Sequence, residues 1–488
     1  MTTFYITTAI DYVNSKPHVG HAYEKIISDV LARWHRLLGE DVYFLTGTDE
    51  NAQKNAQAAQ EAKIDTKTFV DKNSLAFKHL CDALAISYDD FIKTTEKRHV
   101  QVAQQIFEEL SKKGDIYKGM YEGLYCYGCE AYYNEKDLVD GKCPEHNKAP
   151  TWIKQESYFF KISKYEKQVL KLVKSKNFIL PESKRNEIVQ RLETDGLKDL
   201  CVSRYGAEWG IEVPFDKKHK IFVWIDALVN YISALGYPDQ KNYKKFWPAN
   251  VHVVGKGINW FHSVIWPCIL FSIGAKQPQT ILVHGYLTAE GKKISKSLGN
   301  VIDPLTLIQT YGVDALRYFL IREIPFSQDG DYSEASLKAR LNNELNNDLG
   351  NLVSRVLTLA EKNFKEIKKV PVDKTLSAAF DLQKIKDIVD SYELHNALSE
   401  IWTFVHAVNR YINEKKLWEC KGDDLHQQIY TLLECLRVLG IVLYPFIPGA
   451  ADKINQQLGV KLGTFKDCSF GKVASYKVKK GANLFTKV

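Results

Sequence analysis

The sequence lacks the features that mark membrane-spanning, secreted and repetitive chains. No apolar run approaches the roughly 18 residues that a membrane span needs. The start, MTTFYITTAI, has no basic segment of the kind that a secretion signal carries, and no internal repeat or low-complexity segment follows. Nine cysteines in 488 residues favour thiols or a metal site over a disulfide framework. We therefore expect a cytoplasmic protein without membrane contact.

The composition is that of an ordinary globular protein with a mild surplus of positive charge. Hydrophobic residues make up 45% of the chain and charged residues 26%, which is typical of about two to four domains at this length. The net charge is +7, and some lysines are grouped, as in KNYKK, GKKISKS and YKVKKG. This surplus suits a polyanionic partner, although charge alone is explained as well by a mildly basic protein without one.

The stretch DYVNSKPHVGH, residues 11–21, carries the first chemical signal. It puts His18 and His21 three residues apart, about one helical turn, so that both rings point to one side. The preceding TFYITTAI is β-branched and aromatic, which predicts a buried strand. The following AYEKIISDVLARWHRLLG has helical spacing and ends at Gly39. We expect the histidines at the N-terminus of this helix, where phosphate is readily bound.

The order of patterns predicts an interrupted α/β domain followed by helices. DVYFLTGTDE reads as a second strand, residues from about 116 are cysteine-bearing and turn-rich, and the α/β style resumes from 220. Apolar residues then recur at helical spacing to about 450, while the last twenty residues are lysine- and glycine-rich. We expect an α/β fold: a Rossmann-like parallel-sheet domain split by an insertion, then an α-helical bundle and a loosely held tail. The predicted boundaries are 1–115 and 218–287 for the two halves of the sheet domain, 116–217 for the insert, 288–345 for a lysine-rich loop region and 346–488 for the bundle.

Three cysteines and one histidine have the spacing of a zinc site. YCYGCEAYYNEKDLVDGKCPEH gives C-x2-C, thirteen residues, then C-x2-H. Two residues between ligands let a tight turn aim both side chains at one point, and two such turns make a tetrahedral site. Because no position is left open for a substrate, we expect one structural Zn2+ per chain in a zinc knuckle. The predicted ligands are Cys126, Cys129, Cys143 and His146.

A lysine-rich loop in the second half is the other candidate for phosphate chemistry. In HGYLTAEGKKISKSLGNVID a strand is followed by Lys293 and Lys296, three residues apart among serines. Such a loop can bring mobile ammonium groups onto a polyphosphate. Taken alone, the pattern is equally typical of a charged surface loop, and it gains weight only beside the histidine turn.

Together, PHVGH and KISKS resemble the HIGH and KMSKS signatures of class I aminoacyl-tRNA synthetases. The finer resemblance is to the methionyl-tRNA synthetase family, and it covers nearly the whole chain. It is carried by YITTAIDYVNSKPHVGHAYE, FLTGTDE, VSRYGAEWGIEVP, VWIDALVNYI, GINWFHSVIWP, LVHGYLT and GKKISKSLGN. The resemblance implies a ligase that activates L-methionine with ATP to methionyl-adenylate, releasing pyrophosphate, and transfers methionine to tRNA(Met) for protein synthesis. Mg2+ would accompany the ATP.

The resemblance also implies roles for individual residues. Those implied in catalysis are His18, His21, Lys293 and Lys296. Those implied in ATP binding are His18, Gly20, His21, Glu24 and Lys296. Those implied around methionine are Ile10, Tyr12, Asp49, Trp224, Ala227, Tyr231, Ile258 and His262, with Asp49 facing the substrate ammonium group. Those implied in reading the anticodon are Asn351, Arg355 and Trp418, and residues 288–345 would contact the tRNA stem.

One departure from the family pattern concerns ATP. Gly257 stands where an Asp commonly holds the ribose, so that a backbone group or another carboxylate such as Glu24 would have to replace it. The insert of about 100 residues is too short for the editing domain of the valine, isoleucine and leucine enzymes, which implies reliance on one pocket.

Three other interpretations remain open at this stage. A class I enzyme for cysteine also uses zinc, but there the metal binds substrate and needs an open position. A nucleotidyltransferase with the same histidine turn is much shorter and lacks the helical bundle. A zinc-bearing RNA-binding protein would bind tRNA without ATP turnover. We expect a monomer, because no dimerisation domain is evident after the bundle.

Overall fold

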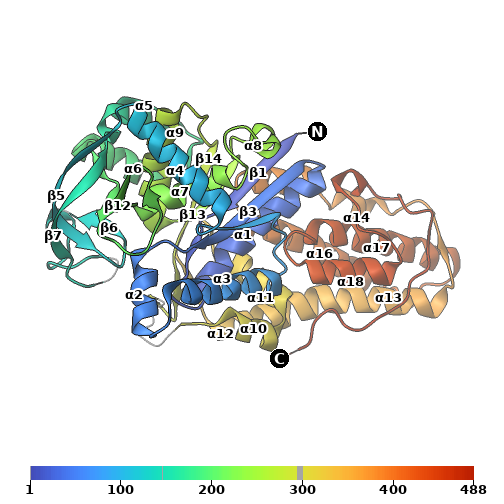
Figure 1. Ribbon diagram of the computed structural model, residues 1–488. Coiled ribbons are helices and arrows are strands. Elements are labelled where there is room, and N and C mark those ends of the chain that lie inside the picture. Colours follow the sequence, from blue (N-terminus) through green and yellow to red (C-terminus); the bar gives the residue numbers. More distant parts are fainter. Residues whose placement is uncertain (1, 134, 145–146, 294–300, 488) are drawn as a thin grey trace.

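Three regions lie side by side in the molecule (Figure 1). The computed structural model describes residues 2–133, 135–144, 147–293 and 301–487. An α/β region with one parallel sheet lies in the middle, a long antiparallel sheet lies at one end, and a helical bundle lies at the other. The predicted fold class, a split Rossmann-like domain followed by a helical bundle, is confirmed. In the described part of the chain, no helix combines the length and the apolar character that crossing a membrane requires.

The central sheet has seven strands, and every pairing in it is parallel. Its order is β2-β3-β1-β13-β14-β8, with β4 also paired to β3. The bounds are β1 Thr3–Thr8, β2 Asp11–Tyr12, β3 Asp41–Asp49, β4 Asp90–Lys93, β8 Ile179–Leu180, β13 Val251–Gly255 and β14 Thr280–His284. β8 belongs to residues 116–217, so the predicted insert supplies one strand of the main sheet. The strands are mostly buried on both faces, as parallel sheets require.

The order of strands places a crevice between β1 and β13. β3, which follows β1 and the short β2 along the chain, lies beside β1, whereas β14 lies on the far side of β13. Connections therefore leave the carboxyl ends of β1 and β13 in opposite directions, which opens a binding crevice at this point. The register pairs Ile6 with Val251 and Thr8 with Val253.

Helices cover both faces of this sheet, and α1 (Val19–Leu38) lies against its centre (Figure 1). α1 begins at its N-cap His18 and ends at Gly39, whose φ of 86° suits a glycine C-cap. Its apolar side buries Ile26, Val30 and Trp34. The other helices here are α2 Gln53–Glu61, α3 Thr66–Ala83, α4 Lys97–Lys112, α7 Val223–Ser233, α8 Lys241–Phe246 and α9 Trp266–Ile273.

The insert is built on a long hairpin of β5 and β7. β5 (Ile116–Cys126) pairs antiparallel with β7 (Thr151–Phe160), and the chain between them forms the cysteine turns at the hairpin tip. β6 and β9 complete that sheet, and β10, β12 and β11 form a second one. The remaining bounds are β6 Ala131–Tyr133, α5 Glu166–Val173, α6 Glu182–Asp195, β9 Leu200–Cys201, β10 Ser203–Tyr205, β11 Glu212–Val213 and β12 Asp216–Ile221.

A small sheet and a group of helices connect the α/β region to the bundle. The sheet contains β15 Leu287–Ala289, β16 Lys292–Lys293 and β17 Gly330–Tyr332. The connecting helices are α10 Pro304–Tyr311, α11 Val313–Glu323 and α12 Glu334–Ala339. The bundle contains α13 Asn351–Asn363, α14 Lys374–Ala378, α15 Leu382–Asp390, α16 Leu394–Glu414, α17 Gly422–Leu443 and α18 Pro448–Leu458.

The expectation of a loosely held tail is wrong. β19 (Ser475–Tyr476) pairs with β18 (Ile367–Lys368), and Tyr476 is 1% exposed, with its hydroxyl bonded to the buried Glu434. Leu484 is buried as well. A few apolar side chains placed against the bundle are enough to hold a segment whose composition is that of a flexible end.

A buried arginine joins α1 to the bundle. Arg317 of α11 is fully buried, and its Nη2 lies 2.7 Å from Oδ2 of Asp29 in α1. It also donates to the carbonyl oxygens of Pro445 and Phe446, between α17 and α18, at 2.8 and 2.9 Å. Burial and the neighbouring Arg33 lower the pKa of Arg317, while Asp29 opposes them. A desolvated charge with this many partners fixes the position of the bundle against the helix that carries His18.

Candidate active site

The two histidines cap the N-terminus of α1 and each other. Nδ1 of His18 accepts from the amide of Gly20 at 3.1 Å, and Nδ1 of His21 accepts from the amide of His18 at 3.0 Å. The rings lie 3.8 Å apart between centroids. A side chain on residue 20 would meet the His18 ring at 2.9 Å, so a larger residue there would push this ring out of its capping position. This geometry confirms the prediction that the two histidines lie at the N-terminus of a helix.

The capping bonds settle which ring nitrogen carries the proton. Because a backbone N–H donates to each Nδ1, a neutral ring holds its own hydrogen on Nε2. Burial and Lys25 lower the pKa of His21 to about 3, so that this imidazole is neutral at ordinary pH. Both histidines therefore present an Nε2–H donor beside the positive end of α1, which is the arrangement an anionic phosphate needs.

A cavity of about 390 Å³ opens at the crevice between β1 and β13. It brings together the histidines of α1, the residues after β1 and the residues after β13. Every residue that the sequence resemblance assigns to methionine lines it: Ile10, Tyr12, Asp49, Trp224, Ala227, Tyr231, Ile258 and His262. His18, His21 and Glu24 line it too.

The walls of the cavity are aromatic on one side. The rings of Trp224 and Phe261 stack at 3.7 Å and 6°, and Tyr12 meets Trp224 edge-on at 6.2 Å. The hydroxyl of Tyr231 lies 2.7 Å from Nε2 of His262, whose Nδ1 lies 2.9 Å from the carbonyl oxygen of Ile258. Since a carbonyl only accepts, His262 is protonated on Nδ1 and takes the Tyr231 hydroxyl hydrogen; burial lowers its pKa to about 4.

Asp49 supplies negative charge at the carboxyl end of β3. It is 2% exposed, and it accepts from the amide of Asn51 at 3.3 Å. Burial and the Asp226 carboxyl raise the pKa of Asp49 well above its ordinary value, and Lys54 acts in the opposite direction. A cationic ligand group here would restore the ionised form, because an adjacent positive charge favours a carboxylate.

Several residues around the cavity escaped the sequence analysis. Lys25 is 2% exposed, and its ammonium donates to Thr8 Oγ1 and to the Ala9 carbonyl, each at 3.0 Å. Nε2 of His284 at the end of β14 lies 3.0 Å from Oε2 of Glu24. Lys54 and Phe261 are two further residues around the cavity that the sequence analysis did not single out. Only Lys25 had a sequence signal, since it lies four residues after His21 on the same helix face.

Gly257 leaves space that a tyrosine uses. A side chain on residue 257 would lie 2.0 Å from the hydroxyl of Tyr286, and both residues line the cavity. Lys256 lies over the Tyr286 ring at 4.6 Å and is held by Asp329 at 2.6 Å. Where the family commonly has an aspartate, this chain thus has Gly257, and the Tyr286 side chain fills the space that a side chain at 257 would take.

The lysine loop can be placed only by its described ends. Lys293 ends β16, and its side chain is not described; Lys296 lies outside the described residues. After the loop, the carbonyl of Ile302 accepts from the amide of Val19 at 3.1 Å, directly beside His18. The chain therefore returns from the loop to the first turn of α1.

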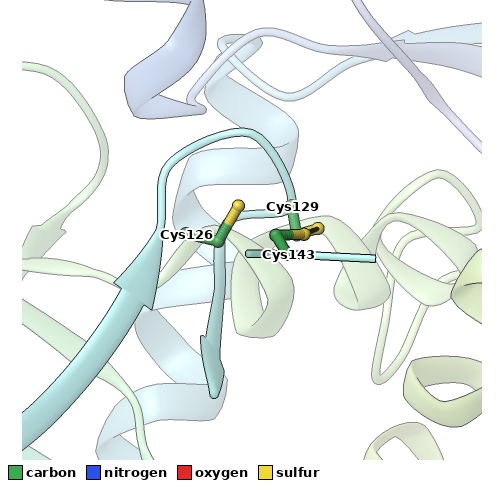
Figure 2. Close-up of side chains that lie close together, drawn as sticks. All are labelled: Cys126, Cys129 and Cys143. Carbon is green, nitrogen blue, oxygen red and sulfur yellow. Dashed lines mark hydrogen bonds between the residues drawn. The ribbon is translucent and has the colours of Figure 1, made fainter. Parts of the chain in front are cut away.

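Three of the four predicted metal ligands, the cysteines, converge at the tip of the β5–β7 hairpin (Figure 2). The sulfur atoms of Cys126, Cys129 and Cys143 all lie within 4.8 Å of one another, and those of Cys129 and Cys143 are 3.4 Å apart. Tetrahedral Zn–S bonds of about 2.3 Å need sulfurs roughly 3.8 Å apart, so the donor set fits zinc. His146 lies outside the described residues. No disulfide joins any of the nine cysteines, all of which are described.

The three predicted anticodon residues lie at the surface of the bundle. Asn351 and Arg355 are one turn apart on α13, and Arg355 Nη2 donates to Asn413 Oδ1 of α16 at 2.9 Å. Trp418 follows α16 and is 59% exposed, the side chain of a large aromatic residue left open to solvent. An exposed tryptophan and surface amide and guanidinium groups on one helical bundle are suited to unpaired bases.

Comparison with known proteins identifies the class. The family model "tRNA synthetases class I (M)" matches residues 4–150 and 136–357, and the "Anticodon-binding domain of tRNA ligase" matches 377–480. The latter range includes Trp418 but not Asn351 or Arg355. The chain therefore belongs to the class I tRNA synthetases.

Individual relatives identify the family within this class. The methionine–tRNA ligase of Caldanaerobacter subterraneus subsp. tengcongensis is 45% identical over 504 residues, covering 100% of this chain and 79% of that ligase. That of Rickettsia felis is 46% identical over 477 residues, covering 94% and 92%. The structure of Mycobacterium tuberculosis methionyl-tRNA synthetase in complex with methionyl-adenylate superposes with a TM-score of 0.95 at 36% identity, over 99% of this chain and 100% of that one. Within its class, the chain belongs to the methionine–tRNA ligase family, and the prediction of an ATP-dependent ligase is confirmed.

Proposed function

We propose that the cavity between β1 and β13 is where this chain activates L-methionine with ATP, before it transfers methionine to tRNA(Met). The methionine carboxylate attacks the α-phosphate of ATP, methionyl-adenylate forms and pyrophosphate leaves. The terminal ribose hydroxyl of tRNA then attacks the activated carbonyl, and AMP leaves. The observation that carries this proposal is that neutral histidine donors at a helix N-terminus and a buried carboxylate with aromatic walls line one cavity.

The phosphate end of the cavity is assigned to α1. Negative charge grows on the phosphate oxygens in the transition state, and the Nε2–H groups of His18 and His21 donate to it. Gly20 lets the nucleotide approach the helix, and Glu24 stays near the ATP ribose. Lys293 and Lys296 are assigned to the β- and γ-phosphates as pyrophosphate leaves, which the return of the loop to Val19 supports. Mg2+ would bind through the ATP phosphates rather than through a protein cage.

The other end of the cavity is assigned to methionine. Asp49 pairs with the substrate ammonium group, and the Trp224, Tyr12 and Tyr231 rings surround the thioether, for which sulfur–aromatic contacts are favourable. In the described part of the chain, the buried Tyr12 hydroxyl and Trp224 Nε1 have no hydrogen-bond partner. Buried donors of this kind are normally satisfied, so a bound substrate or its water would complete them.

The remaining assignments concern the metal, the tRNA and the domains. Cys126, Cys129 and Cys143, with His146, would hold one structural Zn2+ that supplies fixed geometry to the turns and no open position for chemistry. Asn351, Arg355 and Trp418 would read the anticodon, and residues 288–345 would contact the tRNA stem. We keep the predicted domain boundaries, except that residues 179–180 are assigned to the main sheet. We also propose that the protein is a cytoplasmic monomer.

Amino-acid-dependent exchange of pyrophosphate into ATP tests this proposal directly. Purified protein is assayed with methionine, cysteine, leucine and isoleucine in parallel, without tRNA. We expect exchange with methionine well above the other three, because the aromatic walls favour contact with a polarizable thioether. Exchange driven best by cysteine would overturn the assignment in favour of the other zinc-using enzyme of this class.

A further inference from the structure

Lys54, near the start of α2, touches both the cavity wall and the cysteine turn. Its ammonium lies 3.2 Å from the centre of the Tyr12 ring, and it donates to the carbonyl oxygen of Gly128 at 3.2 Å. Gly128 stands between Cys126 and Cys129, so its carbonyl is part of the C-x2-C turn. One side chain thus connects a residue of the proposed methionine site to backbone whose shape the cysteines set.

The backbone of Lys54 is held by the same turn. Its amide donates to Oε1 of Glu130 at 2.9 Å, and Glu130 directly follows Cys129. Glu130 is 1% exposed and has a left-handed backbone with φ of 52°, a conformation that is uncommon outside glycine. Because the N-cap residue Ala52 offers no side-chain acceptor, this carboxylate satisfies an N-terminal amide of α2. The turn therefore holds Lys54 at two points.

The position of Lys54 matters to the cavity itself. Lys54 lines the cavity together with Asp49 and Tyr12. A cation over the face of Tyr12 restrains that ring, and the ring in turn contacts Trp224 edge-on. Its charge also favours the ionised form of the neighbouring Asp49 carboxyl.

We propose that Lys54 is a positioning residue through which the metal turn holds the methionine end of the cavity in its binding geometry. The inference rests on the proposed assignment of the cavity to methionine. When the Cys126–Cys129 turn is fixed, the Gly128 carbonyl and the Glu130 carboxylate hold Lys54 in place. Lys54 in turn restrains the Tyr12 ring. When the turn loosens, as after loss of the metal ion, Tyr12 is released and methionine binds more weakly, although no metal ligand touches the substrate.

Equilibrium dialysis of labelled methionine, without ATP, tests the first half of this proposal. The proteins are the wild type, Lys54→Met, the conservative Lys54→Arg, and Lys72→Met as a matched control that replaces an exposed lysine of α3. We expect Lys54→Met to raise the methionine dissociation constant about ten-fold or more, as for loss of a desolvated cation–π contact. Lys54→Arg should restore most of the affinity, and Lys72→Met should match the wild type.

Zinc removal tests the second half. The wild type and Lys54→Met are dialysed zinc-loaded and after chelator treatment, with zinc content measured and circular dichroism used to show that both remain folded. We expect chelation to weaken methionine binding in the wild type and to add little in Lys54→Met, because the connection is already broken. Equal affinities of the wild type and Lys54→Met, or additive effects of chelation and substitution, would overturn the inference. A wild type that binds no methionine would instead refute the proposed function.

Discussion

The cavity at the sheet edge and the outer surface of the helical bundle use polar side chains in opposite ways. Around the cavity they are buried and held: Asp49 is 2% exposed, and backbone amides orient the rings of His18 and His21. On the bundle, Trp418 is 59% exposed and Asn351 lies open to solvent. Transition-state charge is stabilised by donors that are already in place, whereas bases of a flexible RNA loop need accessible surfaces to stack on. The two regions should therefore respond differently to the same kind of substitution.

The strongest test of this contrast is His21→Ala. Removing one preorganised donor to the growing phosphate charge should slow methionine-dependent pyrophosphate exchange about 100- to 1,000-fold, and Lys296→Ala should slow it comparably. Methionine binding measured by dialysis should stay near the wild-type value. His79→Ala, on an exposed position of α3, is the control. Unchanged exchange in both active-site variants would refute the assignment of the phosphate end.

Asp49→Asn probes the methionine end of the same cavity. A charge-assisted bond to the substrate ammonium group is worth roughly 1.5–3 kcal/mol, so the KM for methionine should rise about ten- to a hundred-fold. The KM for ATP should change little, since Asp49 lies at the end of β3 rather than beside α1. A rise in both constants would show that the two ends of the cavity are not separable.

Trp418→Ala carries the comparison to the bundle. Stacking on one base contributes about 1–3 kcal/mol, so the KM for tRNA(Met) should rise about five- to a hundred-fold. The exchange rate without tRNA should equal that of the wild type, because this side chain is exposed and far along the chain from the cavity residues. Trp418→Phe should retain part of the affinity. Loss of exchange activity would contradict the separation of the two regions.

A smaller effect is expected from Tyr231→Phe. The change deletes only the hydroxyl that donates to His262 and leaves the ring as a wall of the cavity. A net hydrogen bond of about 1 kcal/mol predicts a rise of roughly five-fold in the KM for methionine. The rate at saturating methionine is the internal control, and a large fall in that rate would give Tyr231 a role in the chemistry itself.

The last prediction concerns pH and stability rather than activity. His21 has a pKa lowered by burial to about 3, so between about pH 6.5 and 3 the unfolded chain binds a proton that the folded chain does not. The stability that the neutral His21 contributes to the folded chain is therefore fully present above pH 6.5 and is lost as the pH falls toward 3. In His21→Gln, unfolding at about pH 5 should take up about one proton fewer, measured from the pH dependence of urea denaturation. An identical pH dependence would mean that His21 is protonated in the folded state.

Local patterns explain how much of the fold was predictable. Helix α1 was predictable to its last residue because apolar spacing, the proline before it and Gly39 after it all agree. The cysteine spacing likewise identified three side chains that do converge. The tail was mispredicted because its composition suits a flexible end, while the contacts that hold Tyr476 come from α17, far away in sequence.

The sequence by itself determined the strand–turn–helix joint, the metal turns and the helical bundle, since each depends on residues close together in the chain. Only the tertiary structure decided that Asp49, Trp224 and the histidines share a cavity, because strand order brings β1 and β13 together across more than two hundred residues. It also decided the place of Phe261, which begins a wide π-helical turn (Phe261–Ile265). The spacing of apolar residues in the sequence does not predict such a turn. The burial of Lys25 and the connection through Lys54 have the same origin: a charged side chain is stable in the interior only where several distant segments supply its partners.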